Sequence, residues 1–368
     1  MNSSVPRILW VVMLIGWTSS RVASGAEGEE PVFTHEAAKT AQAEFTSTVT
    51  ELVATHRDTF GKALDRLIQD LGKALDAATR SKKVEDANTI DQARKAAQAR
   101  RQELIESRKV RTHLPGVVKP PSRLKKARDR YGKTMARSKK ERERALERAL
   151  EVYIRELGRA AKDALGTQSL TEANLIREEQ ERREAELEFL KLPPAERMWR
   201  MLAEAAEKKS FKETGRLGGK GGAEYRDFPR QGGLLVGLEV IFLRRDGFRF
   251  AWGVKPIFRT AKGEQEGVYH GGNSGGKERV MAKAGYAVGG VTCWCDSHIV
   301  RRIRVRFMKI IPDGLDTADF YESEWIGEFE AGEPQESMTS GGFIIGVAGR
   351  AGAGLDALGL LEVSTRAE

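Results

Sequence analysis

Residues 341–360 read GGFIIGVAGRAGAGLDALGL and decide the fold of the second half of the chain. An apolar run is followed there by a glycine-rich segment and then by a second apolar stretch. The same alternation of apolar runs and glycine-rich segments extends over the residues after Tyr225, where further apolar runs lie at 234–243, 280–287 and 303–308. Short apolar runs bounded by Gly and Asp are typical of β-strands, so we predict an all-β domain of antiparallel strands.

Several motifs of this region resemble those of jacalin-related lectins. In that family a closing strand leads through a loop into the sequence Leu-Asp-Ala-x-Gly, as residues 341–360 do here. Supporting matches are His270-Gly271-Gly272 with Gly275-Gly276, the segment 285–290 leading into 303–307, and the opening pair Gly232-Gly233. The resemblance covers about 225–364 of a domain at 225–368. It implies a β-prism of three four-stranded antiparallel sheets around a pseudo-threefold axis.

The resemblance also implies a site. In that family a sugar lies in a shallow pocket of loops, where a Gly-x-x-x-Asp loop supplies backbone N–H donors and a carboxylate. The match here is Gly352-Ala353-Gly354-Leu355-Asp356, and Gly233 is also expected at the site. Charge-assisted hydrogen bonds to a fixed carboxylate orient a ligand that has little apolar surface. Ala353 and Gly354 depart from the family because they offer no bulky or aromatic face. In the alternative reading, Gly352 and Asp356 only shape a turn.

The N-terminus is typical of a secretory signal peptide over residues 1–26. Arg7 precedes the apolar run 8–17, and the small residues 23–26 follow where cleavage is expected. This run is too short to cross a bilayer core of about 30 Å as a helix, and no later stretch is longer. We therefore expect a secreted or periplasmic protein without a membrane segment after cleavage. The alternative is a retained signal anchor.

Residues 27–209 are predicted to be helical. Apolar positions recur in steps of three and four from Phe45 to Ala74 and repeat every eleven residues, which gives a nearly straight stripe for packing against another helix. His56 falls in this stripe, and we interpret it as a packing residue in preference to a ligand. Such helices also offer a surface for a homo-oligomer.

An internal repeat divides the helical region. Residues 67–90 and 153–176 align without a gap at an offset of 86 residues. Each copy predicts a long helix, a tight turn and a returning helix, with Ser169 and Glu172 forming a capping box after the second turn. Two coiled-coil-like αα-hairpins are therefore expected, at about 34–109 and 123–190. Prolines between them forbid a continuous helix.

Charged residues and glycines are distributed unevenly along the chain. Residues 225–368 hold 18 basic and 19 acidic side chains, so the net charge of +9 comes from the preceding region. Much of it lies in 108–144, with fifteen basic and three acidic residues. This cluster predicts either a solvated helix face or contact with an anionic envelope polymer or lipid head groups. Export and the lack of interleaved aromatic residues argue against nucleic acid as the partner of this cluster.

Residues 210–224 are glycine-rich and predict a flexible linker.

No pattern in the sequence indicates an enzyme. Residues 271–277 fit Gly-x-x-x-x-Gly-Lys, but Glu278 replaces the Ser or Thr that would hold magnesium, and a strand is expected to follow. The histidines have no metal-ligand spacing, so no cofactor or metal is expected.

Cys293 and Cys295 are two residues apart and lie on the same face of a predicted strand. A disulfide between them would be strained there, so we expect two free thiols.

The sequence therefore predicts a multidomain α + β protein, with long antiparallel helical hairpins followed by an all-β, β-prism-like domain. The function expected is that of an exported carbohydrate-binding protein, whose partner is a glycan or cell-envelope polysaccharide. The alternative is a structural or protein–protein interaction module of the cell envelope that binds no sugar.

Overall fold

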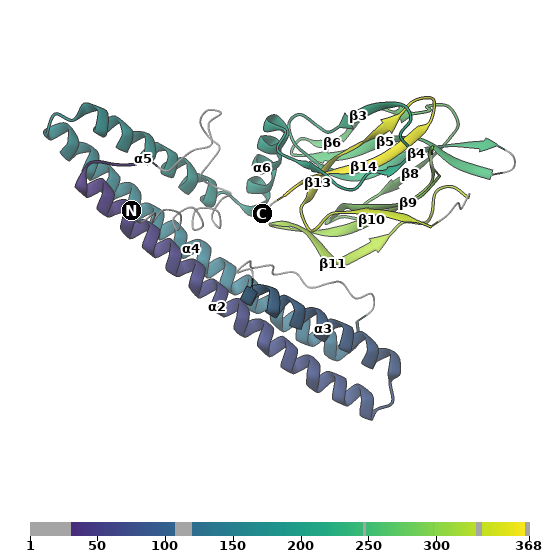
Figure 1. Cartoon of the computed structure of the whole chain (residues 1–368), viewed down its shortest axis with the longest axis horizontal. Helices are drawn as coiled ribbons and strands as arrows, with labels where there is room; N and C mark the ends of the chain where they lie inside the picture. The colour runs from purple at the N-terminus through teal and green to yellow at the C-terminus, as the bar shows by residue number, and fades with distance from the viewer. Residues whose placement is uncertain (1–30, 107–119, 246–247, 297, 329–332, 365–368) are drawn as a thin grey trace, which may run out of the picture. The chain divides into compact units, whose positions relative to one another are not determined.

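The computed structural model describes residues 31–106, 120–245, 248–296, 298–328 and 333–364. The expected signal peptide at 1–26 lies outside the described residues. The chain divides into two compact units, with the boundary between Leu192 and Pro193 (Figure 1). The first unit is helical, and the second holds all the strands together with one helix.

In its described residues, the helical unit has two long helices and two shorter ones. These are α2 (Glu36–Arg80), α3 (Val84–Glu106), α4 (Ser122–Gly166) and α5 (Leu170–Lys191). Both long helices have 45 residues and start 86 residues apart. Figure 1 shows α2 and α4 side by side, with α3 along one half of the pair and α5 along the other.

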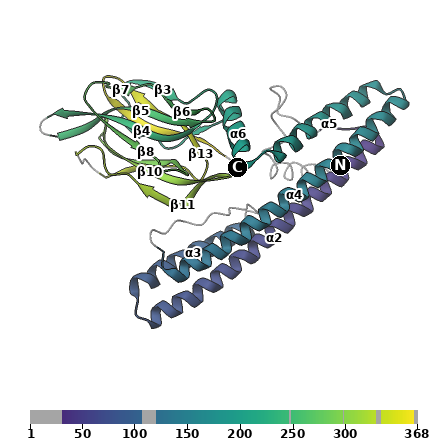
Figure 2. The ribbon, with the colours of Figure 1, turned by 180° about the vertical axis from the view of Figure 1, so that it is seen from behind.

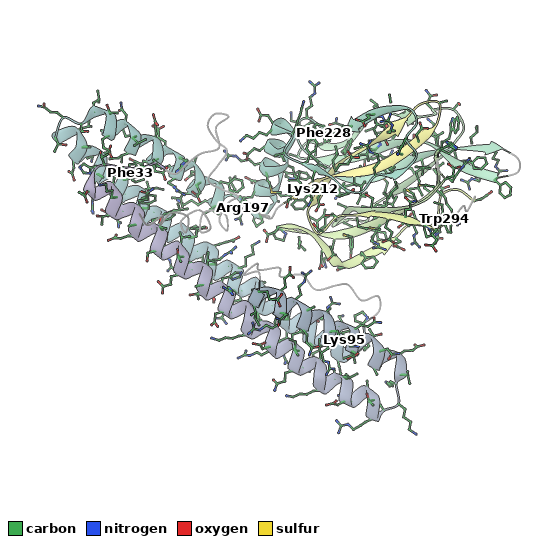
Figure 3. The ribbon with its side chains drawn as sticks, viewed as in Figure 1. Phe33, Lys95, Arg197, Lys212, Phe228 and Trp294 are labelled. Carbon is green, nitrogen blue, oxygen red and sulfur yellow. The ribbon has the colours of Figure 1, made fainter. Side chains whose placement is uncertain are left out.

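Each half of the α2–α4 pair has its own hydrophobic core. The start of α2, the end of α4 and α5 share one core, which includes Phe33 just before α2 (Figure 3). The end of α2, α3 and the start of α4 share the other. The predicted hairpins therefore pack against each other through their long helices, because neither long helix can bury its apolar stripe against its short partner alone. Eight of the nine stripe positions from Phe45 to Ala74 are buried, with only Leu52 partly exposed.

Glu172 does not form the expected capping box. Ser169 makes no side-chain cap hydrogen bond. The Glu172 carboxylate instead accepts hydrogen bonds from the backbone N–H groups of Thr34 and His35, at 2.7 and 3.0 Å. These donors lie at the start of α2, where N–H groups have no partner within the helix. Glu172 therefore joins the beginnings of α2 and α5.

Helix α6 (Pro194–Lys208) belongs to the β unit. Its apolar side chains Met198, Met201 and Leu202 lie in the same core as the strands. Gly232 lies directly against it, because a Cβ on Gly232 would come within 2.3 Å of the backbone nitrogen of Ala203. Figure 2 shows α6 at one end of the strands, near β13. The helix thus closes one end of the β unit.

The β unit is built from three antiparallel sheets. One has the order β1-β14-β13-β3 with β2 also on β14, the second β11-β10-β9-β12, and the third β6-β5-β4-β8 with β7 also on β5. The strands are β1 (Lys212–Glu213), β2 (Leu217–Gly218), β3 (Ala223–Asp227), β4 (Leu234–Arg245), β5 (Phe248–Thr260), β6 (Gly263–Glu266), β7 (His270–Gly271), β8 (Gly276–Met281), β9 (Tyr286–Cys295), β10 (Val300–Ile311), β11 (Gly314–Glu322), β12 (Gln335–Met338), β13 (Phe343–Ala351) and β14 (Leu355–Val363).

The predicted fold class is confirmed, since helices precede three curled antiparallel sheets in a prism-like arrangement. Buried side chains from all three sheets meet in one core. Two sheets have five strands instead of the expected four, because the short strands β2 and β7 join them. Cys293 and Cys295 are both free and buried, as their shared strand face predicted.

The glycine-rich segment 210–224 is not a flexible linker. It contains β1 and β2 and the start of β3, all paired to β13 or β14. Its glycines allow close approach of backbones: a Cβ on Gly219 would lie 2.3 Å from the carbonyl oxygen of His298, and Gly218 has φ +117°. Glycine-rich composition therefore marks tight packing here, which composition alone does not distinguish from flexibility.

Candidate functional site

The predicted loop connects β13 to β14. Gly352 and Ala353 are exposed, Gly354 is buried and Asp356 is half-buried. The N–H of Gly352 donates to the carbonyl oxygen of Gly354 at 3.0 Å, which closes a tight turn. The structure therefore brings the predicted site residues Gly352, Ala353, Gly354 and Asp356 together in one hairpin.

A second glycine turn, between β2 and β3, lies against Asp356. A Cβ on Gly221 would be 2.6 Å from Asp356 Oδ1, and one on Gly222 would be 2.5 Å from Oδ2. Gly222 also has φ +59°, a conformation in which a side chain is strained. The N–H of Gly219 donates to the carbonyl oxygen of Asp356 at 2.8 Å. Only glycine allows this turn to approach the carboxylate so closely.

Arg350 holds the two turns together. Its guanidinium donates to the carbonyl oxygens of Gly221 and Gly222, both at 2.7 Å. It also forms an ion pair with Glu224 at 3.1 Å. A planar guanidinium with several fixed donors is well suited to join a turn to a strand in this way. Arg350 thereby positions the backbone that faces Asp356.

Trp252 of β5 forms the adjoining wall. A Cβ on Gly354 would lie 2.8 Å from Cζ3 of its ring, and one on Gly272 would lie 1.8 Å from Nε1. The residue is half-buried, and within the described residues its indole N–H donates to no protein group. The N–H of Gly272 donates to the Trp252 carbonyl oxygen at 3.0 Å. The indole is therefore an aromatic group beside the loop that the loop sequence itself does not contain.

Contacts of His270 hold the turn that contains Gly271 and Gly272 in place. His270 Nε2 lies 3.1 Å from Asp227 Oδ2, and the rings of His270 and Tyr225 stack at 3.9 Å between centroids. Burial raises the pKa of Tyr225. Gly271 has φ +86°, and its backbone is packed against Gly354. This cluster supports the Asp356 loop from β3 and β7.

We call Gly221, Gly222, Trp252, Gly352–Gly354 and Asp356 the Asp356 site. Within the described part of the chain, the Asp356 carboxylate accepts no hydrogen bond from protein. The N–H groups of Gly221, Gly222, Ala353 and Gly354 likewise donate to no described protein group. The site therefore combines one carboxylate acceptor with several backbone donors, a set that hydroxyl groups can satisfy because each can both donate and accept.

Gly233 is not part of the site. It is buried just before β4, where a Cβ would lie 2.8 Å from Pro229 and 3.0 Å from the carbonyl oxygen of Arg259. The glycines beside Asp356 are Gly221 and Gly222, which the sequence interpretation had assigned to a linker. Trp252 was also missed, because no local pattern around it indicates that its strand borders the loop. Arg350 lies in the motif directly before the loop, but no local pattern indicates that its guanidinium contacts Gly221 and Gly222.

Other kinds of site are not found in the described ranges. No group of three or more His, Cys, Asp or Glu residues there is placed to hold a metal ion. The segment after Gly276, whose Gly-x-x-x-x-Gly-Lys pattern resembled a phosphate loop, is strand β8 and not a helix. No helix among the described residues has the length and apolar character needed to cross a membrane.

Comparison with known proteins gives structural likeness only. No protein-family model matches the chain, and no curated protein matches its sequence. Wild-type Malaysian banana lectin matches with 18% identity and a TM-score of 0.32, over 42% of this chain and 99% of that one. Calystegia sepium agglutinin matches with 18% identity and a TM-score of 0.34, over 42% and 97%. A mannose-binding jacalin-related lectin from Ananas comosus matches with 15% identity and a TM-score of 0.32, over 42% and 99%.

Proposed function

We propose that the β unit binds a carbohydrate at the Asp356 site and that the chain is an exported glycan-binding protein. The observation that carries the proposal is the Asp356 carboxylate, which is half-buried beside two glycine turns and accepts no hydrogen bond from described protein groups. A polar group held in this way has its geometry set by the fold and its hydrogen-bonding capacity left for a ligand.

A sugar fits this set of groups better than an apolar ligand does. Two adjacent hydroxyls can donate to the two carboxylate oxygens, while their oxygens accept from the N–H groups of Ala353 and Gly354. Hydrogen bonds to a charged acceptor are stronger than neutral ones, so Asp356 provides most of the polar affinity. The benzene-ring edge of the Trp252 indole packs against Gly354 and adds apolar surface at the edge of the site.

The proposal is tested with the full chain on a glycan array, followed by titration of the best ligand into the Asp356→Asn variant. A hydrogen bond to a charged group contributes about 1.5–3 kcal/mol, so affinity should fall about ten- to hundredfold. The melting temperature should hardly change, because the carboxylate accepts no described protein hydrogen bond. Glu324→Gln is the matched control, since it removes one exposed negative charge from the same unit outside the site.

The alternative function is a structural or protein–protein interaction module of the cell envelope. Ala353 and Gly354 give the loop itself no bulky or aromatic face on which a sugar could stack, and this favours the alternative. A parent protein that binds no glycan, with an Asp356→Asn variant that melts early, would establish a turn-shaping role in place of sugar binding.

Export is the second half of the proposal and rests on the sequence of residues 1–26. Sequencing the N-terminus of the mature protein from its native host tests it directly. A chain that begins after the small residues 23–26 supports export, whereas a chain that retains Arg7 and the apolar run contradicts it.

A further inference from the structure

A row of basic side chains follows one face of α4. Consecutive positions are separated by three or four residues, and all are exposed. The row, which we call the α4 basic stripe, consists of Arg123, Lys126, Arg130, Lys133, Arg137, Lys140 and Arg144. With a helical rise of 1.5 Å per residue, it extends for about 31 Å and presents one positive charge about every 5 Å.

The stripe faces away from the core of the helical unit. The buried row of the same helix segment includes Leu124, Ala127, Tyr131 and Met135, which pack in the core shared with α2 and α3. At 100° per residue the stripe lies on the far side of the helix from that row. Gly132 and Ala136 are exposed along one flank and are too short to cover the charges.

Most of the stripe has no protein counter-charge. Arg130 pairs with Asp70 of α2 at 2.7 Å, and Arg137 pairs with Glu141 at 2.8 Å. In the described part of the chain, the other five residues form no ion pair or hydrogen bond through their side chains. Like charges three and four residues apart destabilise a helix, so the stripe does not serve the stability of α4.

The partner helix shows that the architecture does not require these charges. Helix α2 has the same length, and its positions 86 residues earlier are also exposed. The equivalent residues are Ala37, Thr40, Glu44, Ser47, Glu51, Ala54 and Asp58. Three of them are acidic and none is basic, so two paired helices of the same unit carry opposite charge on the corresponding face.

We propose that the α4 basic stripe binds an extended acidic polysaccharide. A single straight row of cations complements a linear chain of carboxylate or sulfate groups, and release of the counter-ions of such a polymer drives binding. No aromatic side chain lies in the stripe to stack nucleobases. Ala136 is the one exposed apolar residue of this helix face within 123–144, which is too little to insert into a membrane surface.

The stripe lies in the helical unit and the Asp356 site in the β unit, so the two can be tested separately. The probe is dextran sulfate, with alginate as a carboxylate polymer and dextran as the uncharged reference, titrated into the full chain at several salt concentrations. The test variant is Lys126→Gln, Lys133→Gln, Lys140→Gln. Its control is Lys73→Gln, Lys83→Gln, Lys162→Gln, which removes three exposed lysines elsewhere in the same unit.

We expect the test variant to bind both acidic polymers at least tenfold more weakly, with the slope of log affinity against log salt reduced by about two. The control variant should bind within about twofold of the parent, and helical circular dichroism should be unchanged in both. Equal loss in the two variants would overturn the proposal in favour of a net-charge effect. Preference for phosphatidylglycerol vesicles or single-stranded DNA over both polysaccharides would also overturn it. Loss of glycan binding at Asp356 alone would leave this proposal standing.

Discussion

The stability of the helical unit should depend on pH through His56. This histidine is buried midway along the α2–α4 pair, where Nδ1 lies 2.8 Å from Ser138 Oγ. Burial, with smaller contributions from Arg142 and Lys139, lowers the pKa of His56 from 6.5 to about 4. The unfolded chain therefore binds a proton that the folded chain does not bind. Stability is full above pH 6.5 and falls as the pH drops toward 4.

The size of the effect follows from the two pKa values. With 6.5 in the unfolded chain and about 4 in the folded chain, full desolvation would cost about 2 kcal/mol of unfolding free energy between pH 7.5 and pH 5. We expect about half of this free energy. Lys139 and Arg142 beside the ring are half-buried, so nearby water screens the charge of the protonated imidazole. A change of 1 kcal/mol in a unit of this size corresponds to a few degrees in melting temperature.

The assay compares the parent with His56→Gln, which keeps a hydrogen-bonding group near Ser138 but does not titrate. Thermal unfolding is followed by the helical circular dichroism signal at pH 7.5, 6, 5 and 4. Other groups titrate equally in both proteins, so their difference isolates His56, and it should shift in favour of the variant as the pH falls. His298→Gln, at an exposed histidine of the β unit, is the control. A parent-minus-variant difference that stays constant from pH 7.5 to 4 would refute the reasoning.

Further predictions concern the packing of each unit. Replacing Arg183 with Met removes the buried cation that pairs with both Glu179 and Glu186, although Arg182 still pairs with Glu179, so the helical unit should lose about 3–5 kcal/mol in denaturant unfolding; an unchanged midpoint would contradict this. Leu202→Ala should destabilise the β unit alone by about 2–5 kcal/mol, as measured by its strand signal. Fragment 193–368 should melt cooperatively. Fragment 225–368 should not, because it lacks α6, β1 and β2. Equal melting of the two fragments would show that these elements are dispensable.

Part of the candidate site could be predicted from sequence because it is continuous in the chain. Residues 352–356 form one hairpin loop, so the motif that identified Asp356 also identified its neighbours. Gly221 and Gly222 lie more than 120 residues earlier, and a glycine-rich segment has the same composition whether it is flexible or tightly packed. Trp252 lies on β5, far from the loop in the sequence. Pairing of β5 with β7 places Gly272 beside the indole, and the packing of the strands places the same indole against Gly354.

The sequence by itself determined that helices precede an all-β domain and which stripe of α2 is buried, because hydrophobic periodicity is a local property that reports which face of an element is covered. The prism-like arrangement of the sheets was implied only by the resemblance to jacalin-related lectins. It did not determine what covers each face. Tertiary structure decided that α2 packs along α4, that Glu172 caps α2 instead of its own helix, and that α6 closes the β unit. These contacts join residues that are distant in the chain, and their partners are selected by shape and by the satisfaction of buried groups, which no local pattern records.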